Sequence, residues 1–149
     1  MKLWYLSLCY IIGSLAPAPV LAQETRPITL SPLGTYANGA FDQGAAEIVA
    51  HDPQTQRAFV VNAQAATVDV LDLKNPSNPT KIASLDVTPY GAVANSVAVR
   101  EEIIAVAVEN AVKTDPGVVV FFDSALQFRG KVTVGSLPDM LTLCAREKV

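Results

Sequence analysis

Short apolar segments separated by turns recur along this sequence with a regular spacing. Four of them lie at 45–50, 57–62, 67–73 and 81–87, and four more at 95–99, 103–109, 117–123 and 128–135. Matching segments are 46 to 50 residues apart. The segments lack helical periodicity, and residues 67–70 alternate apolar with polar, the period of a half-buried strand. Four strands that recur every ~40–50 residues are typical of propeller blades, so the sequence predicts an all-β fold.

The repeats predict a partial β-propeller of two four-stranded blades, residues 45–90 and 94–135, with the start of a third at 137–142. Residues 23–44 would lead into the first blade, and residues 143–149 form an atypical tail. A propeller closes with about four or more blades, and an open stack leaves a sheet face and strand edges uncovered. We therefore expect a truncated or frameshifted N-terminal fragment, or one piece of an assembly. A β-sandwich with evenly spaced strands is the alternative.

The N-terminus has the three parts of a secretory signal peptide. Lys2 provides the positive start, residues 3–15 are apolar, and small Ala22 stands at the expected cleavage position after two prolines. The alternative is an uncleaved anchor, which the prolines disfavour. The sequence predicts a signal peptide at residues 1–22 and a secreted, periplasmic or cell-surface protein.

The mature chain excludes several classes of partner and site. Loss of Lys2 leaves 10 basic against 14 acidic residues, a net charge of −4, which disfavours nucleic acid as a partner. Its other apolar runs are too short for a membrane span, which needs ~20 residues. Cys144 is the single mature cysteine, so no internal disulfide can form. One histidine, His51, and one cysteine cannot provide the four ligands of a zinc site.

Polar residues near the start of each repeat are the candidate metal ligands. Glu47, Asn95 and Asp139 occupy similar places at the start of the first strand of each unit. First strands line the channel of a propeller, so their oxygen atoms could form a ring that binds Ca²⁺. The alternative is a structural role in backbone hydrogen bonds at the entry of each blade. His51 is expected in a solvated turn before Asp52 and Pro53, and no nucleophile motif accompanies it.

Two resemblances follow from these motifs. Residues 57–62 and 67–72 are similar to the repeat of YVTN-type and WD40-like surface propellers, in which Tyr-Val-x-Asn precedes Val-x-Val-Ile-Asp. A second likeness covers nearly the whole mature chain, through the motifs at 30–36, 41–50, 61–63, 94–99, 113–117 and 137–142. These resemble the opening of the choice-of-anchor I family, large secreted or surface-anchored β-propellers that are similar to mesenchyme-specific cell-surface glycoproteins.

The resemblance implies a non-enzymatic, extracytoplasmic interaction module whose partner is a surface protein or a glycan. It brings no catalytic residues with it and no cofactor besides the possible calcium. The alternative function is a calcium-dependent propeller hydrolase of the phytase or phosphatase type, which would use acidic residues in the channel to hold the metal.

Overall fold

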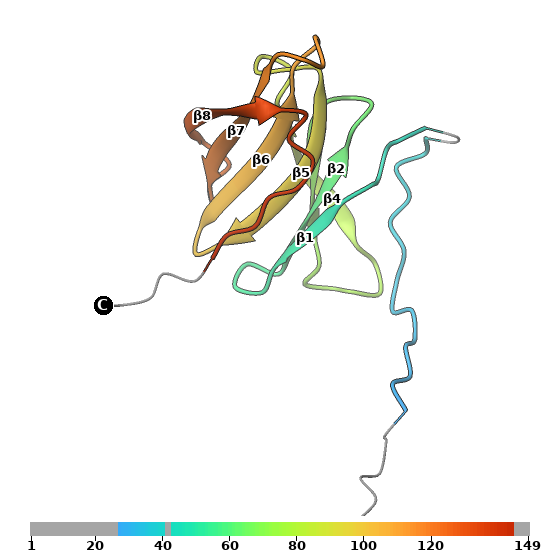
Figure 1. Ribbon diagram of the computed structural model, residues 1–149. Coiled ribbons are helices and arrows are strands. Elements are labelled where there is room, and N and C mark those ends of the chain that lie inside the picture. Colours follow the sequence, from blue (N-terminus) through green and yellow to red (C-terminus); the bar gives the residue numbers. More distant parts are fainter. Residues whose placement is uncertain (1–26, 41–42, 145–149) are drawn as a thin grey trace, which may run out of the picture. The chain divides into compact units, whose positions relative to one another are not determined.

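The computed structural model describes residues 27–40 and 43–144. Its strands are β1 (Val49–Asp52), β2 (Arg57–Asn62), β3 (Thr67–Asp72), β4 (Thr80–Asp86), β5 (Val93–Arg100), β6 (Ile103–Glu109), β7 (Pro116–Asp123) and β8 (Phe128–Ser136). They form two antiparallel sheets of four strands, each in sequence order (Figure 1). The described residues contain no helix. The prediction of an all-β fold with four strands per unit is confirmed, and the sheets have the arrangement of partial propeller blades.

Chain contacts separate residues 1–31 from residues 32–149, and both sheets belong to the second unit. The first unit is described only over residues 27–31, which are exposed and carry no strand. The predicted signal peptide at residues 1–22 lies outside the described residues.

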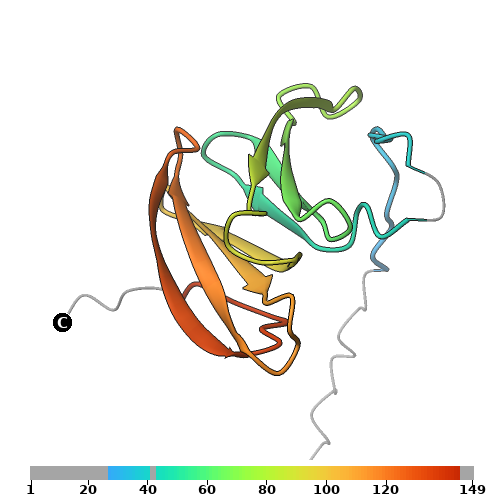
Figure 2. The ribbon, with the colours of Figure 1, turned by 90° about the horizontal axis from the view of Figure 1, so that it is seen from above.

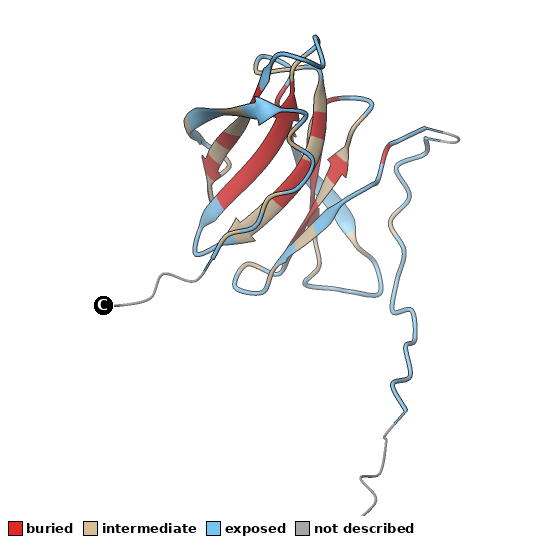
Figure 3. Cartoon of the chain, viewed as in Figure 1, coloured by how far each residue is buried: buried red, intermediate tan, exposed pale blue. Residues whose placement is uncertain are grey.

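Burial follows the composition of each strand (Figure 3). In β6 every residue after Ile103 is buried, because its run of Ile, Ala and Val has no polar side chain until Glu109. Strands buried on both faces read as continuous apolar runs. The edge strand β8 is mostly exposed and carries polar residues between its apolar ones. The two central strands of each sheet are therefore its most buried part.

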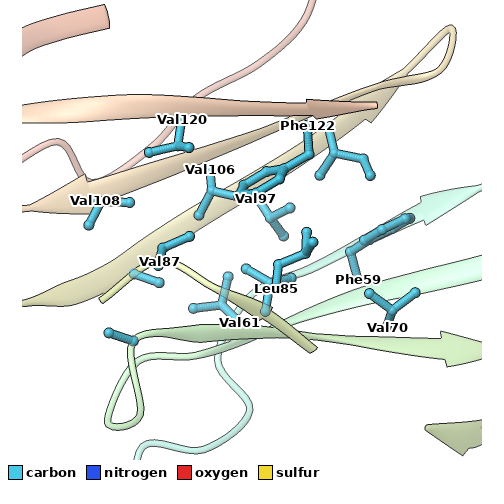
Figure 4. Close-up of a cluster of buried hydrophobic side chains, with 14 residues drawn as sticks. Phe59, Val61, Val70, Leu85, Val87, Val97, Val106, Val108, Val120 and Phe122 are labelled. Carbon is cyan, nitrogen blue, oxygen red and sulfur yellow. The ribbon is translucent and has the colours of Figure 1, made fainter. Parts of the chain in front are cut away.

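The two sheets pack face to face around one core. Buried apolar side chains from both sheets form a single cluster, which includes Phe59, Val61, Val68, Val70 and Leu85 of the first sheet and Val97, Ile104, Val106, Val120 and Phe122 of the second (Figure 4). Strand β5 contacts β1, β2 and β3, and Figure 2 shows the two sheets from above. Complete burial of one such side chain is worth ~1.5–3 kcal/mol. The shared cluster therefore makes the two sheets one folded body.

Strand register shows which positions of the two sheets are equivalent. Arg57 pairs with Asp72 in the first sheet, and Ile103 pairs with Asp123 in the second. Counting along the strands from these pairs, the second sheet has Val106 opposite Val120 where the first has Val60 opposite Asp69. Val106 and Val120 belong to the core between the sheets. Their counterparts in the first sheet lie on the face that points away from that core, since neighbouring strand residues alternate between faces.

Strand β1 differs from its prediction. The sequence indicated a strand at 45–50 and a turn from His51, whereas the strand is Val49–Asp52 and His51 is an exposed strand residue paired with Ala58. The side chain of Asp52 explains why the strand ends two residues later than predicted. It accepts hydrogen bonds from the backbone N–H of Gln54 (3.0 Å) and the hydroxyl of Thr55 (2.6 Å). This Asx-type turn closes only after Asp52, so pairing continues through His51.

Candidate functional site

Glu47 and Asn95, two of the predicted calcium ligands, occupy equivalent places. The carbonyl of Val61 accepts a hydrogen bond from the Glu47 N–H (3.1 Å), and the Val61 N–H donates to the carbonyl of Ile48 (2.8 Å). Two residues thus face one, which is the geometry of a β-bulge. In the second sheet the ladder between β5 and β6 skips Asn95 in the same way. Both residues are therefore the extra residue of a bulge at the start of their blade.

Asn95 links three parts of the second sheet. Its Nδ2 donates to Oε2 of Glu109 on β6 (3.2 Å) and to the carbonyl of Pro138 (3.1 Å). Glu109 is 7% exposed and lies 3.7 Å from the ammonium group of Lys113. A buried carboxylate needs such partners, since removal from water without them is costly. Asn95 therefore ties β5 to β6 and to the segment after β8.

Residues 137–144 continue from β8 along β5. The backbone N–H of Leu141 donates to the hydroxyl of Ser96 (3.4 Å), and Arg100 donates to the carbonyl of Leu143 (3.4 Å). Figure 1 shows this red segment passing over β5 toward the C-terminus. The segment forms no strand ladder, although the sequence places the start of a third unit there. Cys144, at its end, is an exposed free thiol.

Asp139, the third predicted ligand, lies in the segment after β8. It is exposed and lies three residues after the end of β8 at Ser136, whereas Asn95 lies nine residues after the end of β4 at Asp86. Over residues 27–40 and 43–144, no three His, Cys, Asp or Glu side chains gather as a metal site. The calcium ring remains a prediction.

A hollow of ≈ 410 Å³ lies on the face of the first sheet that points away from the core. It is lined by Val60 and Asp69 from the sheet and by Tyr36, Ala37, Asn38, Gly39, Ala40, Ala45 and Ala46 from the segment before β1. Ligand sites usually enclose ~300–1,000 Å³, so the hollow has the size for a small ligand. We refer to this feature as the β2–β3 hollow.

Asn38 shapes the rim of the β2–β3 hollow. Its Nδ2 donates to the carbonyl of Ala45 (3.0 Å), and its Oδ1 accepts from the N–H of Ala40 (3.0 Å). The asparagine thereby ties the incoming segment to the residues just before β1. Both ends of its amide are engaged, so Asn38 positions the wall of the hollow and leaves ligand contacts to its neighbours.

Asp69 forms the polar part of the β2–β3 hollow. The residue is 3% exposed, and its Oδ1 accepts from the hydroxyl of Ser84 (2.5 Å) and lies 2.7 Å from Nζ of Lys81. Sequence reasoning missed this site because Asp69 reads as the solvent-facing member of an alternating strand. The signal was present in the repeat: the second unit has Val120 at the equivalent position.

The comparisons with known proteins agree with the fold. The sequence profile of the choice-of-anchor I domain matches residues 47–148, a range that contains all eight strands and the two residues before β1. No curated protein matches the chain. No helix in the described part of the chain is long and apolar enough to cross a membrane. The chain therefore belongs to the choice-of-anchor I domain family, which indicates a surface-associated module.

Proposed function

We propose that this protein is exported through its N-terminal signal and acts outside the cytoplasm as a non-enzymatic interaction module. The observation that carries the proposal is the family match over residues 47–148, which spans both sheets. Export is also favoured by the order of the first 22 residues, a lysine, an apolar stretch and a small residue at the expected cleavage position.

The chemistry of the described polar clusters supports binding over catalysis. Glu109 is buried and already paired with Asn95 and Lys113. Asp69 is paired with Lys81 and Ser84. A general base or nucleophile needs an activating partner within hydrogen-bond reach of a reacting group, and these pairs instead hold strands together. The β2–β3 hollow offers hydrogen-bond acceptance and apolar walls, which suit recognition.

Export is tested by expressing the full chain in a bacterium, separating the cell fractions and measuring the mass of the purified product. We expect the chain outside the cytoplasm, starting at Gln23. The matched control replaces Ile11 and Ile12 with Arg, which interrupts the apolar stretch and should retain the full-length chain in the cytoplasm. An unprocessed wild-type chain in the cytoplasm would contradict the proposal.

Calcium binding and hydrolysis are tested on the exported protein. We expect no turnover of a phosphate ester with or without Ca²⁺, as a binding module requires. Calcium-dependent turnover would instead support the hydrolase alternative. A rise in Tm with Ca²⁺ that Glu47→Gln abolishes would support the calcium prediction, because anionic oxygen ligands set affinity at such sites. An unchanged Tm would overturn it.

A further inference from the structure

We propose that the β2–β3 hollow binds a neutral saccharide unit, with Asp69 accepting a hydrogen bond from a sugar hydroxyl and Tyr36 contacting the sugar ring. The inference rests on the proposed function, because it names the ligand class for a surface interaction module. It is carried by the placement of a buried carboxylate in a hollow whose other walls are mostly small apolar residues beside the aromatic ring of Tyr36.

Asp69 differs in chemistry from its counterpart in the second sheet. The equivalent position in the second sheet holds Val120, which is fully buried in the core. Replacing an apolar residue with a buried carboxylate paired to a partly exposed lysine seldom adds stability, since desolvation of the carboxylate offsets the attraction. Asp69 thus places a hydrogen-bond acceptor on the outer face of the first sheet, where the second sheet has the methyl groups of Val120 at the equivalent position. An acceptor at this position suits a ligand in the hollow better than packing against apolar side chains.

The carboxylate of Asp69 has about four acceptor sites, more than its two described contacts use. Both of its described contacts, with Ser84 and Lys81, use Oδ1. Among the described residues, no fully buried side-chain oxygen or nitrogen lacks a partner. Asp69 also lines the hollow itself. It can accept a hydrogen bond from a donor that enters there.

The charge at the site selects a neutral donor. The ammonium group of Lys81 lies 2.7 Å from Oδ1 of Asp69, so the negative charge of the carboxylate is already balanced. A second cation would be repelled by the ammonium group of Lys81 at short range. A hydroxyl group carries no net charge and can donate a hydrogen bond to the carboxylate. Hydrogen bonds to an ionised acceptor are also stronger than neutral ones. A hydroxyl-rich, uncharged ligand therefore fits better than an amine or a metal ion.

The walls fit the other side of a sugar ring. Val60, Ala45 and Ala46 supply small apolar surfaces, and Tyr36 supplies a half-buried aromatic ring with a polar tip. Tyrosine combines an apolar body with a hydrogen-bonding group and suits surfaces that are partly wet. A pyranose has an apolar C–H face and a rim of hydroxyl groups, which is the complementary pattern. The ≈ 410 Å³ of the hollow accommodates one terminal unit.

The test is an NMR titration of the exported full chain, labelled with ¹⁵N, against methyl glycosides of glucose, galactose, mannose and N-acetylglucosamine. We expect saturable shifts at the residues around the hollow with at least one of them. Ala46→Trp fills the hollow from an exposed position and should weaken binding at least ~10-fold. The matched control, Ala125→Trp, adds the same ring at an exposed turn of the second sheet and should bind like the wild type.

A second variant tests the acceptor directly. Asp69→Asn keeps the size of the side chain, and it should weaken binding about tenfold while the dispersion of the amide spectrum shows a folded chain. No saturable shift with any of the four glycosides would overturn the inference, as would equal affinity in Ala46→Trp and the wild type. An exported chain that binds no sugar overturns this inference alone. A chain that binds sugar but stays in the cytoplasm overturns the proposed function alone.

Discussion

Ile103 and Ile104 are neighbours on β6 with opposite surroundings, and substituting each in turn measures the core between the sheets. Ile104 is 1% exposed and belongs to the shared cluster, whereas Ile103 is 48% exposed. Ile104→Ala should lower the free energy of unfolding by ~2–5 kcal/mol, and Ile104→Val by ~0.5–1.5 kcal/mol, from lost burial plus the cavity left behind. Because about half of Ile103 is in water, Ile103→Val should cost roughly half of the ~0.8 kcal/mol of one buried methylene.

The assay is urea unfolding followed by far-UV circular dichroism on the wild type and the four variants Ile103→Val, Ile103→Ala, Ile104→Val and Ile104→Ala. Loss of β propensity is similar at the two positions, so it cancels in the comparison. We expect the midpoint to fall with an unchanged m value, which reports stability alone. Equal losses at Ile103 and Ile104 would refute the packing of β6 against the first sheet.

Two further results are expected. A Cβ on Gly117 would lie 2.6 Å from Cδ of Pro138 and 2.7 Å from the carbonyl oxygen of Val108. Gly117→Ala should therefore speed amide hydrogen exchange both in residues 137–144 and at the adjoining end of β6, while protection kept at Leu141 would contradict the contact with Pro138. Burial raises the pKa of Asp52, but hydrogen bonds from Thr55 and from backbone N–H groups outweigh it and lower that pKa below its usual value. A lowered pKa stabilises the fold above the unfolded-state value of ~3.9 and loses that contribution as pH falls through the folded value. Thr55→Val should therefore destabilise more at pH 7 than below pH ~3 in urea unfolding, and a pH-independent difference would contradict it.

The central strands could be predicted from the sequence because their chemistry is local. The bounds predicted for β2 and β6, residues 57–62 and 103–109, are those observed. Continuous apolar runs between turn residues leave few other ways to bury the chain. The end of β1 was predicted too early because it depends on a side chain: the turn closes where Asp52 accepts from Gln54 and Thr55, and composition alone does not fix that point.

The polar sites were predictable only in part. Equivalence of Glu47 and Asn95 follows from the repeat, and the β-bulges bear out that placement. The place of Asp139 in the repeat stays a prediction, since an unfinished repeat offers no second strand to fix the register. Asp69 was missed because its burial comes from partners across the sheet, Lys81 and Ser84 on β4, and the register irregularity between Val70 and Leu71 decides which residues those are.

The most direct test of the account is a methyl NOESY spectrum of the mature protein, because the account depends on two blades that share one core. It predicts cross-peaks between side chains of the first sheet, such as Val61 and Val68, and side chains of the second, such as Val97 and Val106. NOEs confined to each sheet, with none between the two sets, would contradict a stacked pair of blades.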